Sequence, residues 1–526
     1  MTALPAPSLG HLLRDRARTH GARDLLRCGA DRLTVAQVDA RSDQVAALLR
    51  AHGVARGDRV ALMLPNGLEF PTCWLGIAKA GAVMVPLNVQ YRAHDLAYTL
   101  ADSGASVVLA DPALAPHVRE AAPRCPALRE LLELPPGSIL SPDAGPVAAE
   151  LHAAPTGIAL DPVGPDDLLN IQYTSGTTGD PKGCMLTHQY WLLLAARAAR
   201  FTGCTADDVV LTAQPFYYMD PQWNVAMCLV AGCPLVILPR FSASTFWREV
   251  RDTGTTFFYV LGTMPVFLLK QPEDPAVERG HRVRFVSCSG IVPQLHAEFE
   301  RRWGVPWREA FGMTETGADL IVPLEDTACV GTGAVGAPVP GKEARVVAPD
   351  GRVLGDGEVG ELCVRGAGMM RGYWNKPEAT AERLRDGWLH TGDLAFRDAT
   401  GYYHLVGRLK DMIRRTGENI SAAEVEGVLA EHPAVRAAAV VPVPDELRGE
   451  EVKAFVQLQP GAEGTDPAAL LAFARARLAA FKVPRFYEYV TDFPRTPSER
   501  VAKHVLLAQR DDQRRGAWDA TTGTWT

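Results

Sequence analysis

The segment Tyr173-Thr-Ser-Gly-Thr-Thr-Gly-Asp-Pro-Lys-Gly183 follows the apolar run Leu168–Tyr173 and precedes a helical run that begins near Gln189. Its glycines and small hydroxyl residues expose N–H groups and hydroxyls that can surround phosphate oxygens, and Lys182 adds a positive charge. The spacing differs from that of a Walker A loop. An ordinary flexible loop is the alternative, and eleven residues in this order disfavour it. We therefore predict a phosphate-binding loop here.

Strand-like and helical patterns alternate along the chain before this loop. Ala36–His52 and Phe70–Ala80 have helical spacing, whereas Arg59–Leu64 and Val83–Leu87 are short apolar runs typical of buried strands. Strands that alternate with helices favour a layered α/β architecture with largely parallel sheets. The sequence thus predicts an α/β fold.

The pattern changes after Gly407, where a more compact unit of mixed helices and strands begins. We predict a large N-terminal domain of layered α/β sheets over residues 1–408 and a small α+β C-terminal domain over residues 409–526. Residues 510–526 are polar and rich in Gly and Thr, so we expect a flexible tail there. The elements expected in the small domain are the helices Ala422–Glu431 and Pro467–Ala480 and the strands Ala437–Val443 and Val452–Leu458.

Composition excludes several classes of function. The 526 residues carry a net charge of -7 with both signs interleaved, which disfavours a nucleic-acid-binding surface. The ten cysteines are scattered without a C-x-x-C pair, which disfavours zinc sites and disulfides and fits a reducing compartment. No apolar run of about 18 residues suggests a membrane span, and the N-terminus lacks a signal-peptide core. We expect a cytoplasmic protein.

A second motif, Phe311-Gly-Met-Thr-Glu315, follows the first along the chain. Together they resemble the adenylate-forming superfamily, which includes acyl-CoA synthetases, adenylation domains of peptide synthetases and beetle luciferases. The resemblance extends from about Leu12 to Leu507. It implies that Phe311 stacks on adenine, that Thr314 contacts phosphate and that Glu315 holds Mg²⁺, a role that suits a carboxylate.

Further motifs carry the nucleotide-binding residues that the resemblance implies. His390-Thr-Gly-Asp393 resembles the motif whose Asp binds the ribose hydroxyls, and Ser287-Cys-Ser-Gly290 stands where the adenine-contacting turn is expected. Gly407-Arg-Leu-Lys-Asp-Met-Ile413 resembles the junction motif, in which Arg408 contacts ribose and Lys410 is the hinge of a mobile C-terminal domain. The implied nucleotide-binding residues are Thr174, Ser175, Gly176, Thr177, Thr178, Ser289, Gly290, Phe311, Gly312, Asp393 and Arg408.

Thr416-Gly-Glu-Asn-Ile420 resembles the loop that lines the tunnel for the pantetheine arm of CoA. A glycine at position 417 leaves room for a narrow arm beside the backbone, although a turn between strands explains it equally well alone. The resemblance implies that Thr416, Gly417 and Glu418 line the CoA tunnel.

The acyl pocket implied by the resemblance is apolar and aromatic, which predicts a hydrophobic carboxylic acid as the substrate. Its residues are Tyr217, Tyr218, Trp223, Gly262 and Met264. Many acyl-CoA synthetases have a His where this chain has Tyr218. That tyrosine either lines the pocket or belongs to the core.

A sharper departure is Pro494-Arg-Thr-Pro-Ser-Glu-Arg500, where the family usually has Gly-Lys in place of Glu499-Arg500. In the family, this Lys reaches the carboxylate and the α-phosphate during adenylation. Arg keeps the charge but is planar and bulkier than an ammonium group. Lys503 is either a substitute or an ordinary helix-surface lysine.

The resemblance implies an acyl-CoA ligase that uses ATP, Mg²⁺ and CoA and works through an acyl-AMP. Lys182, Thr314, Glu315, Lys410 and Arg500 are its expected catalytic residues. The departure at Arg500 leaves two forms open, a complete two-step ligase and an enzyme that thioesterifies an acyl-adenylate supplied by a separate adenylating enzyme. The alternatives are a stand-alone adenylation enzyme that loads a carrier protein, a luciferase-like oxygenase and a non-catalytic acyl-adenylate-binding protein.

Overall fold

The computed structural model describes residues 4–174, 181–262, 264–415, 418–445, 447–495 and 501–526. The chain forms two compact units. The first holds residues 4–174, 181–344 and 364–389, and the second holds 345–363 and 390–526. Packing therefore assigns residues 390–408 to the second unit, whereas the boundary expected at residue 408 concerns a hinge movement and stays a prediction.

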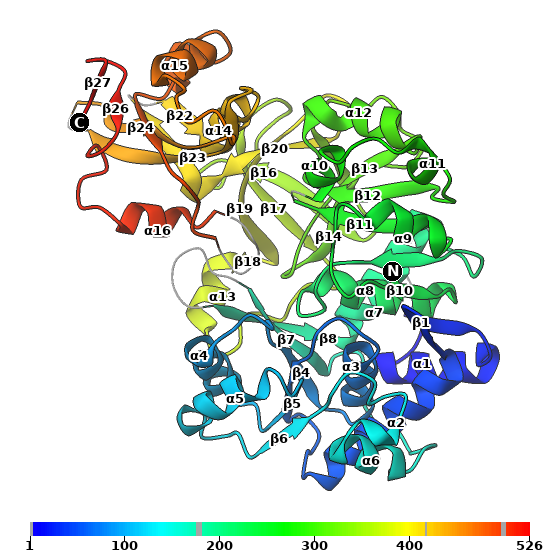
Figure 1. Cartoon of the computed structure of the whole chain (residues 1–526). Coiled ribbons are helices and arrows are strands. Elements are labelled where there is room, and N and C mark those ends of the chain that lie inside the picture. Colours follow the sequence, from blue (N-terminus) through cyan, green and yellow to red (C-terminus); the bar gives the residue numbers. More distant parts are fainter. Residues whose placement is uncertain (1–3, 175–180, 263, 416–417, 446, 496–500) are drawn as a thin grey trace. The chain divides into compact units, whose positions relative to one another are not determined.

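A six-stranded sheet in the first unit carries the Gly/Thr-rich segment (Figure 1). The strands run in the order β6-β5-β3-β4-β7-β8, and neighbours are parallel except the antiparallel pair β7 and β8. Thr174 at the end of β7 lies opposite Lys182 at the start of β8, so the loop joins two neighbouring strands. The strands are β3 (Arg59–Met63), β4 (Val83–Pro86), β5 (Val107–Ala110), β6 (Glu130–Glu133), β7 (Leu168–Thr174) and β8 (Lys182–Thr187).

Helices accompany this sheet as the α/β prediction requires, and the expected helical runs are confirmed. They form α2 (Val35–Ala51) and α3 (Glu69–Lys79), while α7 (His188–Thr202) follows β8. Thr34 begins α2 with a capping box, and its hydroxyl accepts the N–H of Gln37. Further helices of this unit are α1 (Leu9–His20), α4 (Ala93–Ser103), α5 (Ala115–Ala121), α6 (Pro146–Ala153), α8 (Met219–Ala231), α9 (Phe246–Asp252), α10 (Met264–Leu269), α11 (Pro275–Glu278), α12 (Pro293–Trp303) and α13 (Pro377–Arg383).

A second sheet of the first unit runs in the order β15-β14-β13-β12-β11-β9-β10-β1-β2. Strands β10, β9, β11, β12 and β13 run parallel to one another, so the carboxyl ends of β12 and β13 meet at one edge. Ligands of open α/β sheets bind outside such carboxyl ends. The strands are β1 (Asp24–Cys28), β2 (Asp31–Thr34), β9 (Val210–Thr212), β10 (Leu235–Ile237), β11 (Phe257–Leu261), β12 (Phe285–Ser289), β13 (Trp307–Met313), β14 (Gly317–Ile321) and β15 (Ala334–Pro338).

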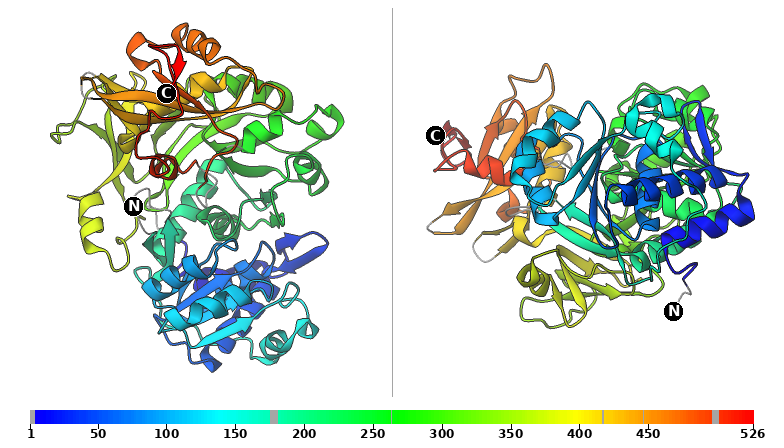
Figure 2. Two further views of the ribbon diagram at one scale, coloured as in Figure 1. Left: turned by 60° about the vertical axis from the view of Figure 1, so that its left-hand side comes forward. Right: turned by 90° about the horizontal axis from the view of Figure 1, so that it is seen from below.

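The second unit contains a sheet of its own, visible from two further directions in Figure 2. Helices α14 (Ala422–Ala430) and α15 (Pro467–Arg475) pack on its apolar core, and the described chain ends after α16 (Lys503–Ala508) with two short strands. The helix expected over Pro467–Ala480 ends at Arg475. The strands are β21 (Met412–Arg415), β22 (Glu418–Ser421), β23 (Val435–Asp445), β24 (Gly449–Leu458), β25 (Phe486–Tyr489), β26 (Trp518–Asp519) and β27 (Thr524–Trp525).

Other strands place nucleotide motifs. β19 (Trp388–Arg397) is antiparallel to β20 (Tyr403–Arg408), and β17 (Gly360–Gly366) is the other neighbour of β19. β16 (Lys342–Val347) and β18 (Leu384–Arg385) complete the described strands. Among the helices described, none has the length and apolar character needed to cross a bilayer.

The structure contradicts the flexible tail that the sequence predicted over residues 510–526. β26 pairs with β25, with Tyr487 opposite Trp518, and the Trp518 side chain is buried in the core of the second unit. The Asp519 carboxylate pairs with the Arg485 guanidinium at 3.0 Å. A buried indole and an ion pair hold the end of the chain to the sheet despite its polar composition.

Candidate active site

Lys182 and Thr174 flank the loop of the first motif. The Thr174 hydroxyl donates to the Lys182 carbonyl at 3.4 Å, and the Lys182 ammonium lies 5.4 Å from the centre of the Tyr373 ring. The expected phosphate contacts Ser175, Gly176, Thr177 and Thr178 lie outside the described residues. The structure therefore places Lys182 at the start of β8, directly after the segment predicted to bind phosphate.

Glu315 lies in the same unit and shares Tyr373 as a neighbour. The Tyr373 hydroxyl donates to Glu315 Oε1 at 2.8 Å, and the Met370 N–H donates to the Glu315 carbonyl at 2.7 Å. Trp374 N–H donates to the Gly183 carbonyl, which ties the segment 370–374 to strand β8. Tyr373 thus joins the cation of one motif to the carboxylate of the other.

The Glu315 side chain fits the role of a ligand for Mg²⁺. Tyr373 occupies Oε1, whereas Oε2 has no hydrogen-bond partner among the described residues. A carboxylate oxygen is the donor that a hard cation prefers. The neighbouring Thr314 is held by its carbonyl, which accepts the Tyr190 hydroxyl at 3.0 Å.

The expected adenine-contacting turn lies at the carboxyl end of β12. Ser289 Oγ accepts the Tyr259 hydroxyl at 2.8 Å and donates to the Ala310 carbonyl. Gly290 has a φ of 94°, a conformation that favours glycine. The turn therefore has a built conformation beside strand β13, which carries Phe311.

Gly312 follows Phe311 and could not be replaced by a larger residue. A Cβ at this position would lie 2.1 Å from the carbonyl oxygen of Gly317 on the antiparallel partner strand β14. Because position 312 has no side chain, β13 and β14 can approach closely, and this approach sets the position of the Phe311 backbone.

Glu309 anchors the same turn, and the sequence analysis did not identify it. Its two carboxylate oxygens accept the N–H groups of Gly290 at 2.7 Å and Ile291 at 2.6 Å. Burial raises the pKa of Glu309 to about 8, although backbone hydrogen bonds from Gly290, Ile291 and Ala310 lower it. An acidic residue two positions before an aromatic-Gly motif was the only signal in the sequence.

This raised pKa predicts a pH dependence of stability. Between the ordinary pKa of about 4.5 and the native value of about 8, the native Glu309 carboxyl keeps a proton that the unfolded chain has lost. The free energy of unfolding should therefore fall as pH rises through this window. Glu309→Gln cannot titrate, so Tm of the wild type relative to this variant should fall by about 3 °C between pH 5 and pH 8. Parallel melting profiles of the two proteins would contradict the assignment.

The ribose-binding residues expected in the second unit meet on adjacent strands. Asp393 on β19 lies opposite Arg408 on β20, and Arg408 Nε approaches Asp393 Oδ1 to 3.1 Å. Asp393 is buried, and its N–H donates to the Thr391 hydroxyl at 3.0 Å. The cation and carboxylate hold each other in place, as a preorganised pair of ribose contacts requires.

The remaining expected residues of the second unit stay predictions. Lys410 lies in the short helical segment Leu409–Asp411, and Glu418 begins β22, but their side chains are not among those described. Thr416, Gly417 and Arg500 lie outside the described residues. Lys503, weighed above as a substitute for the usual lysine, pairs with Glu426 at 2.6 Å.

Two of the expected acyl-pocket residues, Trp223 and Gly262, lie near the expected adenine-contacting turn. The ring of Trp223 on α8 packs edge-on at 5.6 Å against Tyr259, whose hydroxyl holds Ser289. Gly262 N–H donates to the Ser289 carbonyl at 3.0 Å. Tyr217 and Tyr218 form a tilted ring pair at 4.6 Å, and Met264 packs on the core of this unit.

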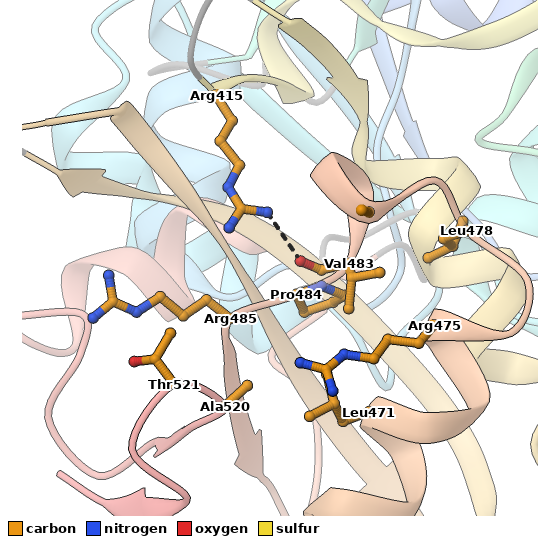
Figure 3. Close-up of a pocket in the computed structure, with 10 residues that line it drawn as sticks. Arg415, Leu471, Arg475, Leu478, Val483, Pro484, Arg485, Ala520 and Thr521 are labelled. Atoms are coloured by element: carbon orange, nitrogen blue, oxygen red, sulfur yellow. Dashed lines mark hydrogen bonds between the residues drawn. The ribbon is translucent and has the colours of Figure 1, made fainter.

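A separate cavity of about 280 Å³ lies within the second unit (Figure 3). Arg415 is one of the residues that line this cavity, and its guanidinium donates to the Val483 carbonyl at 3.2 Å. None of the expected site residues lines it. The lining residues are Arg415, Leu471, Arg475, Leu478, Ala480, Val483, Pro484, Arg485, Ala520 and Thr521.

Known proteins resemble this chain over most of its length. The model of the AMP-binding enzyme family matches residues 13–374, and that of the AMP-binding enzyme C-terminal domain matches residues 424–500. A sulfoacetate–CoA ligase of Cupriavidus necator is 36% identical over 459 residues, covering 87% of this chain and 88% of the relative. A feruloyl-CoA synthase of Amycolatopsis sp. is 36% identical over 490 residues, covering 93% and 96%.

A solved structure shares the whole architecture. ATP-bound MatB from Rhodopseudomonas palustris has a TM-score of 0.85 and 30% identity, with 95% of this chain and 98% of that chain covered. Both family models indicate the same family as the full-length relatives, which are acid–thiol ligases by name. The chain therefore belongs to the AMP-binding enzyme family, as one of its acyl-CoA ligases.

Proposed function

We propose that the enzyme forms the CoA thioester of a hydrophobic carboxylic acid through an acyl-AMP, with a first half-reaction that is slow or lost. The observation that carries the proposal is Glu499-Arg500 in a chain whose other nucleotide-binding motifs are kept. The aromatic surroundings formed by Trp223 and Tyr259 support an apolar acyl group. The ten free cysteines, nine of them buried, support a reducing cytoplasmic setting.

Adenylation needs cations because the carboxylate must approach an anionic α-phosphate. Lys182 supplies one positive charge beside the phosphate loop, and Asp393 and Arg408 orient the ribose. Mg²⁺ held by Glu315 would neutralise phosphate charge. Arg500 is expected to replace the compact ammonium group by a planar guanidinium that holds both reacting anions less closely.

Thioester formation makes other demands. A thiol attacks the carbonyl of the acyl-AMP, and AMP leaves as an anion, so residues that hold the nucleotide matter in both steps. The residue at position 500 is expected to have left the site by then, because in this family the small domain turns between the steps. A separate adenylating enzyme would therefore supply the acyl-AMP.

The two half-reactions test this proposal separately. Purified protein is given a panel of free acids with ATP and Mg²⁺ in one arm and synthetic acyl-adenylates with CoA in the other. We expect acyl-CoA at least about tenfold faster from the adenylates. Equal rates in both arms would establish a complete two-step ligase. Product on a carrier protein's phosphopantetheine but not on CoA would favour a stand-alone adenylation enzyme instead.

Restoring the family's usual residues should repair the slow step. Glu499→Gly combined with Arg500→Lys is expected to raise acyl-AMP formation by about ten- to a hundredfold, which corresponds to about 1.4–2.7 kcal/mol of barrier. Thioester formation from preformed acyl-AMP should change by less than about twofold, because the residue is absent from that step. Both rates are measured on the same preparation.

Lys503→Gln is the matched control. Lys503 already pairs with Glu426, so its loss should leave the rate of acyl-AMP formation within about threefold of wild type. If Lys503→Gln abolishes adenylation while the double change at 499 and 500 has no effect, Lys503 performs the role and the proposal fails.

A further inference from the structure

Three different metal-ligand types converge within the second unit, beside the turn that precedes Asp393. Glu361 and Cys363 lie two positions apart on β17, so both side chains leave the same face of the strand. His390 lies on the neighbouring strand β19 (Figure 1). One ligand atom from each of the three lies within 4.8 Å of the other two.

The His390–Cys363 distance already suits a tetrahedral ion, and the His390–Glu361 pair, now at hydrogen-bond distance, would open by about half an ångström to admit one. His390 Nδ1 lies 2.8 Å from Glu361 Oε2 and 3.4 Å from Cys363 Sγ. Bond lengths to Zn²⁺ place neighbouring ligand atoms about 3.3–3.6 Å apart, so shifts of a few tenths of an ångström would suffice. Nδ1 carries at most one proton, which cannot serve the carboxylate and the sulfur fully at the same time.

Access and donor chemistry agree with such an ion. Cys363 is fully buried, whereas His390 and Glu361 remain 13% and 17% exposed and leave a path from solvent. A thiolate, an imidazole and a carboxylate form a donor set for zinc or cobalt, and Mg²⁺ prefers oxygen ligands alone. Three protein ligands leave a fourth position for water.

We propose that Glu361, Cys363 and His390 bind Zn²⁺ and that the bound ion inhibits the enzyme. On binding, the Cys363 thiol releases its proton to solvent, and the imidazole proton resides on Nε2 so that the Nδ1 lone pair reaches the ion. No group changes oxidation state.

Inhibition follows from what Glu361 holds when the ion is absent. Glu361 Oε1 accepts the N–H of Gly392 at 3.0 Å, directly before the ribose-binding Asp393. Gly392 has a φ of 72°, so the turn depends on this glycine and on its acceptor. A metal ion that takes Glu361 as a ligand would withdraw negative charge from this carboxylate and shift it, which weakens its hydrogen bond to Gly392 and its hold on the turn. This consequence rests on the proposed nucleotide site, whereas binding of the ion does not.

Cobalt tests the binding by itself. When Co²⁺ is added to the purified protein with Mg²⁺ in excess, each chain should bind one cobalt ion. The bound cobalt should give a thiolate-to-cobalt charge-transfer band in the near ultraviolet, and Zn²⁺ should displace it. Cys363→Ser should lose the band and weaken binding by at least about tenfold. His390→Gln should weaken binding similarly and serves if the serine variant does not fold. Cys28→Ser, at the one described cysteine that is not buried, should keep the band.

Each alternative result is informative. Absence of the band in the wild type, or an equal band in Cys363→Ser, overturns the site. Activity supplies the second readout, since micromolar Zn²⁺ should inhibit acyl-CoA formation from acyl-AMP in wild type and Cys28→Ser but not in Cys363→Ser. A cobalt band without any inhibition by Zn²⁺ overturns the inhibitory role. Failure of the proposed slow adenylation would leave the cobalt result unchanged.

Discussion

Glu315→Gln is expected to lower the rate of acyl-AMP formation about a thousandfold, the largest functional effect among the changes considered. The change keeps the shape of the side chain but removes the negative charge that a hard cation requires. A bound metal ion stabilises transition-state charge by several kcal/mol, and about 4 kcal/mol corresponds to a thousandfold. The rate is measured with saturating ATP and Mg²⁺ in single-turnover experiments on the background of Glu499→Gly with Arg500→Lys, where the first step is expected to be fast enough to follow.

Tyr373→Phe is the matched control for Glu315→Gln. It removes the 2.8 Å hydrogen bond to Glu315 but leaves the carboxylate and the ring beside Lys182. A single hydrogen bond contributes about 0.5–1.5 kcal/mol, so the rate should fall about two- to tenfold. Equal losses in the two variants would mean that Glu315 acts through its orientation of Tyr373 and not as a ligand. An unchanged rate in Glu315→Gln would remove Glu315 from the catalytic residues.

Lys79→Met is expected to produce the largest loss of stability. The Lys79 side chain is fully buried, and its ammonium donates to Asp43 Oδ1 and to the Asp39 carbonyl, each at 2.7 Å. Arg14 on α1 pairs with both aspartates, at 2.9 Å to Asp39, so one network joins α1, α2 and α3. Burial lowers the pKa of Lys79, and the two carboxylates oppose that shift by favouring its charged form.

Removing one member of a buried ion network leaves an uncompensated charge, at a cost of about 3–5 kcal/mol. Lys79→Met should lower Tm by roughly 3–5 °C, as measured by calorimetry or by intrinsic fluorescence. Arg56→Met removes a pair with Asp167 at 2.9 Å in which both partners are substantially exposed, and should cost at most about 1 kcal/mol. Similar losses in the two variants would contradict the special role of the buried network.

The sequence analysis succeeded where structure is set by neighbours along the chain. The run Arg59–Leu64 and the helical spacing of Ala36–His52 predicted β3 and α2 within about one residue, because periodicity and apolar runs are local properties. The order of small residues around Lys182 indicated the family without knowledge of any contact. The motifs predicted which residues belong to the site, but they did not predict the hydrogen-bond partners of those residues.

Residues whose role depends on distant partners were missed. Glu309 matters through Gly290, nineteen positions earlier, and Tyr373 through Glu315, fifty-eight positions earlier. The scattered cysteines disfavoured a zinc site in the sequence, yet strand pairing brings Cys363 beside His390. The polar tail predicted as flexible is ordered by the partners of Trp518 and Asp519 on the neighbouring strand.

The sequence by itself determined the family, the α/β class and the identity of the nucleotide-binding motifs, because each motif packs its chemistry into a few consecutive residues. Only the tertiary structure decided that Tyr373 joins Lys182 to Glu315, that Glu309 anchors the turn at Gly290 and that β26 pairs with β25 in the C-terminal sheet. Those contacts depend on strand register and on burial. Both are properties of the whole packed chain, since a shift of one residue in register turns every side chain to the opposite face.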